Sequence, residues 1–285
     1  MTVGDLLVEG ETPITGYRVL RHLRRGADVD VYEVWSEERA CACVAKIIRP
    51  DRPTNSRAAR RLLREGRLLR RLAHLHLARA YAVHVNPPTV ILELLTGATL
   101  ERRLQDTGRL PAEEAACLGV QLCSALHYLH QQPLLHLDLK PSNIVCERGL
   151  AKLLDLSIAR RPGRARRGVG TRHYMAPEQA RGEVVTPATD VWGLGVVLFE
   201  ALTGQPPFRL TPDGPRYPQL VARARPLAAQ RRLPSNVRHL VDAALDPDPR
   251  ARPTLMEAFA VLAGLMPSRP PGSTGEPSRP GLARI

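Results

Sequence analysis

The chain has 285 residues, which is enough for one large domain or two small ones with a sizeable core. Its 44% hydrophobic content excludes a disordered chain, and its 4% of aromatic residues argues against a stacking surface for single-stranded nucleic acid, although the net charge is +13. The first eleven residues lack the basic start of a signal peptide, and the longest uncharged apolar run, between Asp190 and Glu200, is too short to span a bilayer, so we expect no transmembrane segment.

The first 95 residues are predicted to form mostly strands, with one helix. Stretches of strand length that are apolar or alternating lie at 17–23, 29–35 and 41–48. Two shorter strands are expected at 83–85 and 90–94, around a turn that contains Pro87 and Pro88. Residues 56–72 have the apolar spacing of a helix, whose other positions carry seven arginines.

From about Thr99 the pattern changes to helices. Pro111 opens a long helix that ends near 131–133, and after a strand-and-loop stretch at 136–185, Pro187 starts a hydrophobic helix closed by Gly204. Two further helices are predicted near 235–245 and 254–265. Because strands come first and helices follow, we expect an α+β fold with a β-rich lobe and a helical lobe, rather than an alternating sheet.

One motif carries most of the chemistry. Residues 136–143 read His-Leu-Asp-Leu-Lys-Pro-Ser-Asn, which matches the catalytic-loop pattern His-Arg-Asp-Leu-x-x-x-Asn at every fixed position but one. Asp155 follows an apolar strand twelve residues after Asn143, and residues 176–178 read Ala-Pro-Glu. Upstream, Lys46 ends a strand and Glu65 lies on the next helix. This order of residues is the one that phosphoryl transfer from ATP needs.

On these motifs the chain resembles the eukaryotic-type serine/threonine protein kinases, and it is similar to their bacterial branch over about residues 14–266. Asp190 begins a stretch that resembles the family's Asp-x-Trp-x-x-Gly helix start, and residues 248–253 resemble its Asp-Pro-x-x-Arg-Pro. In the family that arginine, here Arg252, pairs with the glutamate of Ala-Pro-Glu, here Glu178. The resemblance implies a two-lobed kinase-like fold, with an N-lobe at 14–95, a helical C-lobe at 96–266 and a disordered tail at 267–285 rich in Pro, Gly and Ser.

The resemblance also implies a role for each polar residue. Lys46 would hold the α- and β-phosphates and Glu65 would orient it, while Asp155 would carry magnesium, or manganese, with Asn143 on a second ion. Asp138 would accept the proton of the substrate hydroxyl. The catalytic set is Asp138, Lys140, Asn143 and Thr171, with Lys140 near the γ-phosphate and Thr171 tying the substrate-facing loop to Asp138. The expected nucleotide contacts are Leu23, Gly26, Val31, Val44, Lys46, Glu65, Glu93 and Leu95, and the metal ligands are Asn143 and Asp155.

Lysine is rare in this chain. Only Lys46, Lys140 and Lys152 are lysines, against 38 arginines among the 41 cationic side chains. If lysines were placed at random among these positions, both phosphate-facing sites would hold one with a probability of roughly one in 270. Lysine is a compact point charge and arginine a wide planar fork, so the two are not interchangeable at a tight phosphate site. The lysine usage therefore supports a phosphate site independently of the resemblance.

The segments that cover and activate the site depart from the family pattern. Of the Gly-x-Gly-x-x-Gly-x-Val loop, residues 24–31 keep only Gly26 and Val31, and Asp28 would repel phosphate if it pointed inward, so we expect a raised KM for ATP. Residues 156–157 read Leu-Ser in place of Phe-Gly, and Leu137 replaces an arginine that would grip a phosphate. Residues 158–170 contain no hydroxyl, which predicts activity that does not depend on phosphorylation of this segment.

The favoured function is ATP- and magnesium-dependent phosphorylation of protein Ser/Thr hydroxyls, with autophosphorylation of tail residues such as Ser268 and Thr274. The alternative is a pseudokinase scaffold that binds nucleotide weakly because of the degraded loop and the Asp-Leu-Ser motif. A basic nucleic-acid-binding protein is the second alternative, with nucleic acid the less favoured partner. The five arginines at 160–167 would suit acidic protein substrates or a phosphorylated partner. A dimer is one open route of regulation. Five cysteines without a CxxC pair are typical of reduced thiols, so we expect a cytoplasmic location.

Overall fold

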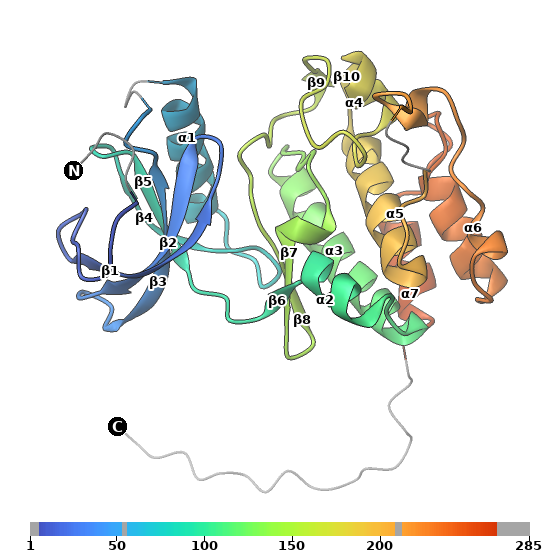
Figure 1. The fold of residues 1–285 in the computed structure, drawn as a ribbon. Helices are drawn as coiled ribbons and strands as arrows, with labels where there is room; N and C mark the ends of the chain where they lie inside the picture. The colour runs from blue at the N-terminus through green and yellow to red at the C-terminus, as the bar shows by residue number, and fades with distance from the viewer. Residues whose placement is uncertain (1–5, 53–55, 209–212, 267–285) are drawn as a thin grey trace, which may run out of the picture.

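The computed structural model describes residues 6–52, 56–208 and 213–266. A β-rich N-terminal lobe stands beside a helical C-terminal lobe (Figure 1). The N-terminal sheet is antiparallel with the strand order β1-β2-β3-β5-β4. Its strands are β1 (Tyr17–Arg25), β2 (Val29–Ser36), β3 (Cys41–Ile48), β4 (Ala80–His84) and β5 (Thr89–Glu93).

Helix α1 (Arg57–Arg71) packs against this sheet. The side chain of Ser56 caps its N-terminus by accepting a hydrogen bond from the Ala59 amide at 3.1 Å. Leu62 and Leu69 are buried, and the seven arginines lie on the exposed side. The helix period therefore also turns Glu65 into the interior, towards β3.

The C-terminal lobe is built around α5 (Pro187–Thr203), which is buried along nearly its whole length. A capping box at Thr186 and Thr189 begins this helix, and Gly204 ends it with a left-handed φ of 75°. The helices around it are α2 (Leu100–Thr107), α3 (Ala112–Gln131), α4 (Pro177–Arg181), α6 (Ser235–Ala244) and α7 (Leu255–Ala263). Helix α3 packs against both α5 and α7.

Two small sheets hold the segments between these helices. The strands β6 (Ala98–Thr99), β7 (Ile144–Glu147) and β8 (Leu150–Leu153) pair in that order, and β9 (Gly163–Arg164) pairs with β10 (Val184–Val185). One hydrophobic core runs from Leu62 and Leu92 in the N-terminal lobe to Leu126 and Trp192 in the C-terminal lobe. Within the described residues, no helix combines the length and the apolar character needed to cross a membrane.

The α+β, two-lobed architecture expected from the sequence is confirmed, with local differences. Strand β4 begins at Ala80, three residues before the expected Val83, because a register shift between Ala80 and Ala82 breaks the alternation that marks a strand in sequence. Helix α4 lies inside the stretch expected to be strand and loop, since five residues are too few to show a helical period. The division at residue 95 and the limit at 266 stay predictions, and the expected tail lies outside the described residues.

Candidate active site

An ion pair in the N-terminal lobe joins β3 to α1. The Nζ atom of Lys46 lies 2.7 Å from Oε1 of Glu65, and the Glu65 side chain is only 3% exposed. Lys46 is placed by its register in the sheet, opposite Val31 on β2 and Val90 on β5. Strand β3 and helix α1 therefore hold one ammonium group in a fixed orientation, on the face of the sheet that carries Val31 and Val90.

The charges around this pair favour the ionised forms of Lys46 and Asp155, whereas burial opposes that of Glu65. Burial opposes the charge on Lys46, but the carboxylates of Glu65 and Asp155 outweigh it and raise the pKa of the lysine. Burial raises the pKa of Glu65, against the attraction of Lys46. Burial also opposes the charge on Asp155, yet Lys46 and the Ser157 amide lower its pKa to about 2. Asp155 is therefore an ionised carboxylate at neutral pH.

The catalytic loop gathers hydrogen-bond donors around Asp138. Oδ1 of Asp138 accepts hydrogen bonds from the amide and the hydroxyl of Thr171, at 2.9 and 2.7 Å. Oδ2 lies 2.8 Å from Nζ of Lys140 and 3.1 Å from Nδ2 of Asn143. Lys140 also donates to the Thr171 hydroxyl at 2.7 Å. The four residues expected to be catalytic thus lie in one connected network.

The buried Asp190 of α5 holds this loop from behind. Its carboxylate accepts hydrogen bonds from the amides of His136 and Leu137, at 2.9 and 2.8 Å, and lies 2.8 Å from Nε2 of His130. Leu137 has a φ of 67°, a conformation that costs energy for a non-glycine residue and persists where its surroundings fix it. The motif that contains Asp190 is visible in the sequence, but its contact with the catalytic loop is apparent only in the fold.

The residues expected to bind metal suit a hard divalent cation. Asp155 offers an ionised carboxylate, and its Oδ1 is steadied by the Ser157 amide at 2.9 Å. Nδ2 of Asn143 donates hydrogen bonds to the backbone oxygen of Asp138 at 2.9 Å and to the Asp138 carboxylate. The side-chain oxygen of Asn143 is thereby left for a cation. Carboxylate and amide oxygens are typical magnesium ligands when phosphate and water complete the shell. The donor set therefore fits the metal that the resemblance implies.

The loop that would cover the phosphates is braced by two arginines. The Gly26 amide donates to the Val29 carbonyl at 2.8 Å, and a Cβ on Gly26 would lie 2.8 Å from that same oxygen. Arg49 donates to the Gly26 carbonyl at 3.1 Å, and Arg52 donates to the Ala27 carbonyl at 3.2 Å. The Asp28 carboxylate lies 3.4 Å from Nε of Arg52, so its charge is partly offset by this arginine.

The expected nucleotide contacts of the N-terminal lobe do not all lie on one face of the sheet. Val31 and Val44 share a face with Lys46, because Val31 is opposite Lys46, and Val44 lies two residues before Lys46 on β3. Leu23 differs: it is the unpaired residue of an irregularity between His22 and Arg24, and it is 40% exposed. Leu95 follows β5, two residues after Glu93.

The segment between Asp155 and α4 is anchored by residues that carry no sequence motif. Nε2 of Gln179 donates to the carbonyls of Leu137 and Val169, at 2.8 and 2.6 Å. Gln219 donates to the carbonyls of Arg172 and Met175, both at 2.9 Å. Single glutamines carry no sequence signal, since only the folded chain places their amides beside these carbonyls.

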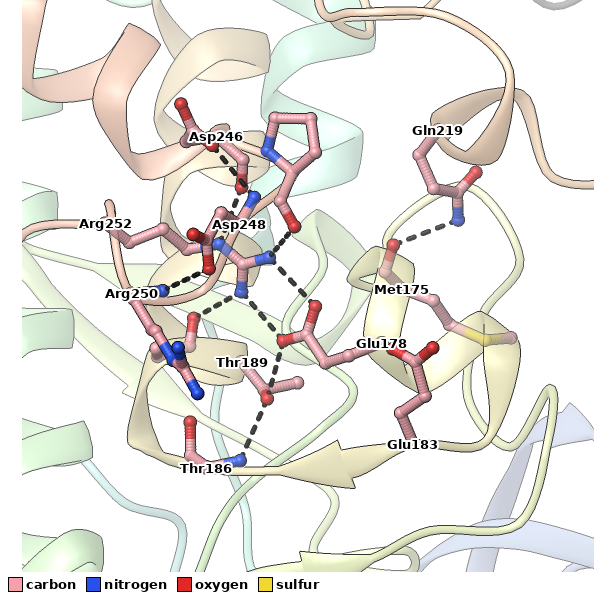
Figure 2. A network of polar contacts seen from close by, with 12 residues as sticks. Met175, Glu178, Glu183, Thr186, Thr189, Gln219, Asp246, Asp248, Arg250 and Arg252 are labelled. Atoms are coloured by element: carbon pink, nitrogen blue, oxygen red, sulfur yellow. Dashed lines mark hydrogen bonds and ion pairs between the residues drawn. The ribbon is translucent and has the colours of Figure 1, made fainter.

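A buried ion pair fixes α4, which follows this segment in the chain (Figure 2). The guanidinium of Arg252 meets the Glu178 carboxylate through two hydrogen bonds of 2.8 Å, and the side chains are 0% and 4% exposed. Thr189 donates to the same carboxylate at 2.8 Å. This is the pair that the family resemblance implies, and it joins α4 to the loop before α7.

Comparison with known proteins identifies the family of the chain. Residues 17–261 match the family model described as protein kinase domain. The chain is 33% identical over 214 residues to the serine/threonine-protein kinase PkaA of Streptomyces coelicolor, covering 67% of this chain and 39% of that protein. It is 33% identical over 230 residues to the probable serine/threonine-protein kinase PkwA of Thermomonospora curvata, covering 77% and 30%.

A third relative is the serine/threonine-protein kinase PrkC of Bacillus subtilis, 32% identical over 200 residues, which cover 67% of this chain and 31% of that protein. The chain thus spans less than half the length of each of these relatives. The family model covers most of the chain, and the catalytic-loop contacts and both ion pairs described above lie within the matched residues. This chain belongs to the protein kinase family.

Proposed function

We propose that this chain transfers the γ-phosphoryl group of ATP to serine or threonine hydroxyls of proteins, with magnesium as the metal. The observation that supports this most directly is the network at Asp138. Its carboxylate is oriented by Thr171, Lys140 and Asn143, while a second cation, Lys46, is held 2.7 Å from Glu65. An oriented carboxylate beside two fixed ammonium groups suits a hydroxyl nucleophile and a polyphosphate.

In this proposal each residue acts through its position. Asp138 accepts the hydrogen of the substrate hydroxyl and aligns the hydroxyl oxygen for attack on the γ-phosphorus. Lys140 lies beside Asp138 and stabilises the charge of the phosphoryl group in transit. Lys46 holds the nucleotide phosphates, and Asp155 and Asn143 hold the metal. When bound, magnesium neutralises phosphate charge.

The test compares the wild-type chain with Asp138→Asn and a matched control, Asp106→Asn. Asp106 forms an exposed pair with Arg102 on α2, so its substitution makes the same chemical change away from the loop. Transfer of labelled γ-phosphate to a generic protein should fall by about 10²–10⁴-fold in Asp138→Asn and remain unchanged in Asp106→Asn. Folded wild-type protein that transfers no phosphate at millimolar ATP, with magnesium or manganese, would contradict the proposal.

The pseudokinase alternative has no observation in its favour at the catalytic loop. A scaffold without catalysis does not need Asp138 connected to Thr171 and Lys140, or Lys46 paired with Glu65, and here all of these contacts are formed. The degraded loop at Gly26 remains the feature that would weaken nucleotide binding. We therefore expect its effect in the KM for ATP rather than in the loss of transfer.

The surface beside the site supports acidic protein substrates. Five arginines between Asp155 and α4 are exposed: Arg161, Arg164, Arg166, Arg167 and Arg172. Arg172 directly follows Thr171, the residue that hydrogen-bonds to Asp138. A concentration of positive charge at the place where a substrate chain must lie favours carboxylate-bearing sequences. We infer that a second copy of the chain can also serve as substrate, and that a dimer would bring the two copies together.

A further inference from the structure

The third lysine of the chain lies in the same kind of setting as the two that the proposed function uses. Each of the three ammonium groups lies within 2.8 Å of a carboxylate: Lys46 at Glu65, Lys140 at Asp138 and Lys152 at Glu93. The motif and the mechanism account for the first two. Lys152 has no role in either, although a chain with 38 arginines places lysine at only three positions.

Lys152 forms a close ion pair across the two lobes. Its Nζ atom lies 2.7 Å from Oε1 and 2.6 Å from Oε2 of Glu93, and the two side chains are 23% and 15% exposed. Oε1 of Glu93 also accepts the Arg79 amide at 2.8 Å, and the Glu93 amide donates to the Arg79 carbonyl at 3.0 Å. Glu93 is therefore fixed to its own lobe by the backbone of Arg79, and to β8 of the other lobe by Lys152.

Both ends of this pair adjoin parts of the nucleotide site. Glu93 ends β5 and lies two residues before Leu95, and both are among the expected nucleotide contacts; residues 93–95 are called the base-binding segment below. Lys152 lies on β8, three residues before Asp155, the carboxylate expected to hold the metal. Leu95 and Lys152 line the same small cavity of about 170 Å³. The ion pair thus spans from the base-binding segment to the strand that delivers the metal-binding carboxylate.

We propose that Lys152 is a positioning residue for the nucleotide: its ion pair with Glu93 sets the spacing between the base-binding segment and Asp155. This inference rests on the proposed function only in requiring that nucleotide binds between these two places. A ligand that reaches both the base-binding segment and the metal should depend on the pair. A ligand that reaches only the base-binding segment should depend on it much less.

The experiment measures binding to the full chain by titration calorimetry, with Mg·ADP and with adenosine. In Lys152→Met we expect the Kd of Mg·ADP to rise about tenfold and that of adenosine about twofold or less. Arg102→Met is the matched control, because it removes a cation from an exposed pair on α2, and it should change neither Kd. In phosphate transfer, the KM for ATP should rise in Lys152→Met while kcat at saturating ATP stays within about twofold.

A double-mutant cycle separates the pair from either residue alone. Glu93→Gln keeps an acceptor for the Arg79 amide but removes the charge, so Lys152→Met should add little further loss of Mg·ADP affinity in that background. The thermal midpoint without ligand is recorded for every variant, to separate positioning from folding. An unchanged Kd of Mg·ADP in Lys152→Met, with or without a lowered midpoint, would overturn the inference.

The remaining outcomes are also decisive. Equal losses for adenosine and Mg·ADP would overturn the spacing role, because the base-binding segment alone would then account for the effect. A wild-type chain that binds no Mg·ADP would overturn both this inference and the proposed function. A wild-type chain that binds Mg·ADP but transfers no phosphate would overturn the proposed function alone, and the binding data would still decide the role of Lys152.

Discussion

At the scale of single residues, Glu65 is the buried carboxyl group that pairs with Lys46. It is almost fully buried, and burial raises the pKa of its carboxyl above the usual value of about 4.3. As the pH falls through this raised pKa, Glu65 takes up a proton and Lys46 loses its charged partner. Asp155 stays ionised over the same range, because its pKa is about 2. We therefore expect the acid side of the kcat/KM profile to report Glu65.

The measurement is the pH dependence of kcat/KM for ATP in the wild type and in Glu65→Gln. The glutamine variant should have lower activity and should lack the fall on the acid side, since it has no proton to take up there. The same fall at the same pH in Glu65→Gln would show that another group is responsible.

The buried pair of Arg252 and Glu178 leads to a prediction of stability. Removing the cation in Arg252→Met leaves a buried carboxylate unpaired and should lower the free energy of unfolding by about 3–5 kcal/mol. Replacing both residues by apolar ones should cost much less, since no charge is then left buried. Urea unfolding measures both variants, and equal losses in the single and double variants would contradict this account.

Residues that belong to a motif could be predicted from the sequence, and residues outside the motifs could not. Lys46, Glu65, Asp138 and Thr171 were selected from motif order, and the structure brings them together as two connected networks. Contacts without a motif were not foreseen. Arg64 donates to the Ala159 carbonyl at 2.5 Å, and Arg52 engages Asp28, across separations that only the tertiary fold closes. The catalytic and binding roles themselves stay predictions.

At the scale of elements, the segment from Ser157 to Thr171 is held by apolar packing and by a short strand pairing. Leu137 stands where the family pattern has an arginine that would bind a phosphate. It is 7% exposed and lies in an apolar cluster with Leu135 and Val185, against which Ile158 and Ala165 pack. This packing and the β9–β10 pairing hold the segment in place. We therefore expect phosphatase-treated protein to keep its full activity.

The measurement compares activity before and after phosphatase treatment, with mass spectrometry to confirm that phosphate is removed. Leu137→Arg should lose activity and not regain it by phosphorylation, because a guanidinium would enter the apolar cluster. A phosphate on Ser157 or Thr171 that activity requires would contradict this prediction.

The exposed arginines of the same segment predict the salt response of substrate binding. Peptides with acidic residues near the acceptor should have a KM that rises with ionic strength, while a neutral peptide should change little. Replacing Arg166 and Arg167 by alanine should raise the KM for the acidic peptide by about two- to fivefold per residue and leave kcat unchanged. A KM for the acidic peptide that does not change with salt would contradict the acidic preference.

Elements were predictable where periodicity was long. The boundaries of α3 and α5 were expected within a few residues, because proline opens the first turn and an apolar run follows. Helix α4 and the pairing of β9 with β10 were not expected, since they have five and two residues and are formed by contacts from the segments around them.

At the scale of the whole molecule, one hydrophobic cluster contains residues of both lobes, while a second cluster, with Val19 and Tyr32, lies within the N-terminal sheet. Leu62 and Leu92 of the N-terminal lobe belong to the same buried cluster as Leu126 and Trp192 of the C-terminal lobe. We expect the lobes to unfold together, in one cooperative transition, despite their different secondary structure. Calorimetry and circular dichroism should give coincident transitions in the absence of ligand. Two resolved transitions would show that the core between the lobes does not couple them.

The placement of all three lysines beside carboxylates has a consequence for amine chemistry. Lys46, Lys140 and Lys152 are the only side chains of this sequence with a primary amine, and each is about one-fifth exposed. Amine-selective acylating reagents would therefore find side-chain amines only at these three positions, around the proposed nucleotide site, while the arginines of the surface would stay unmodified. The extent of acylation at each lysine, measured with and without Mg·ADP, would report nucleotide binding without any introduced label.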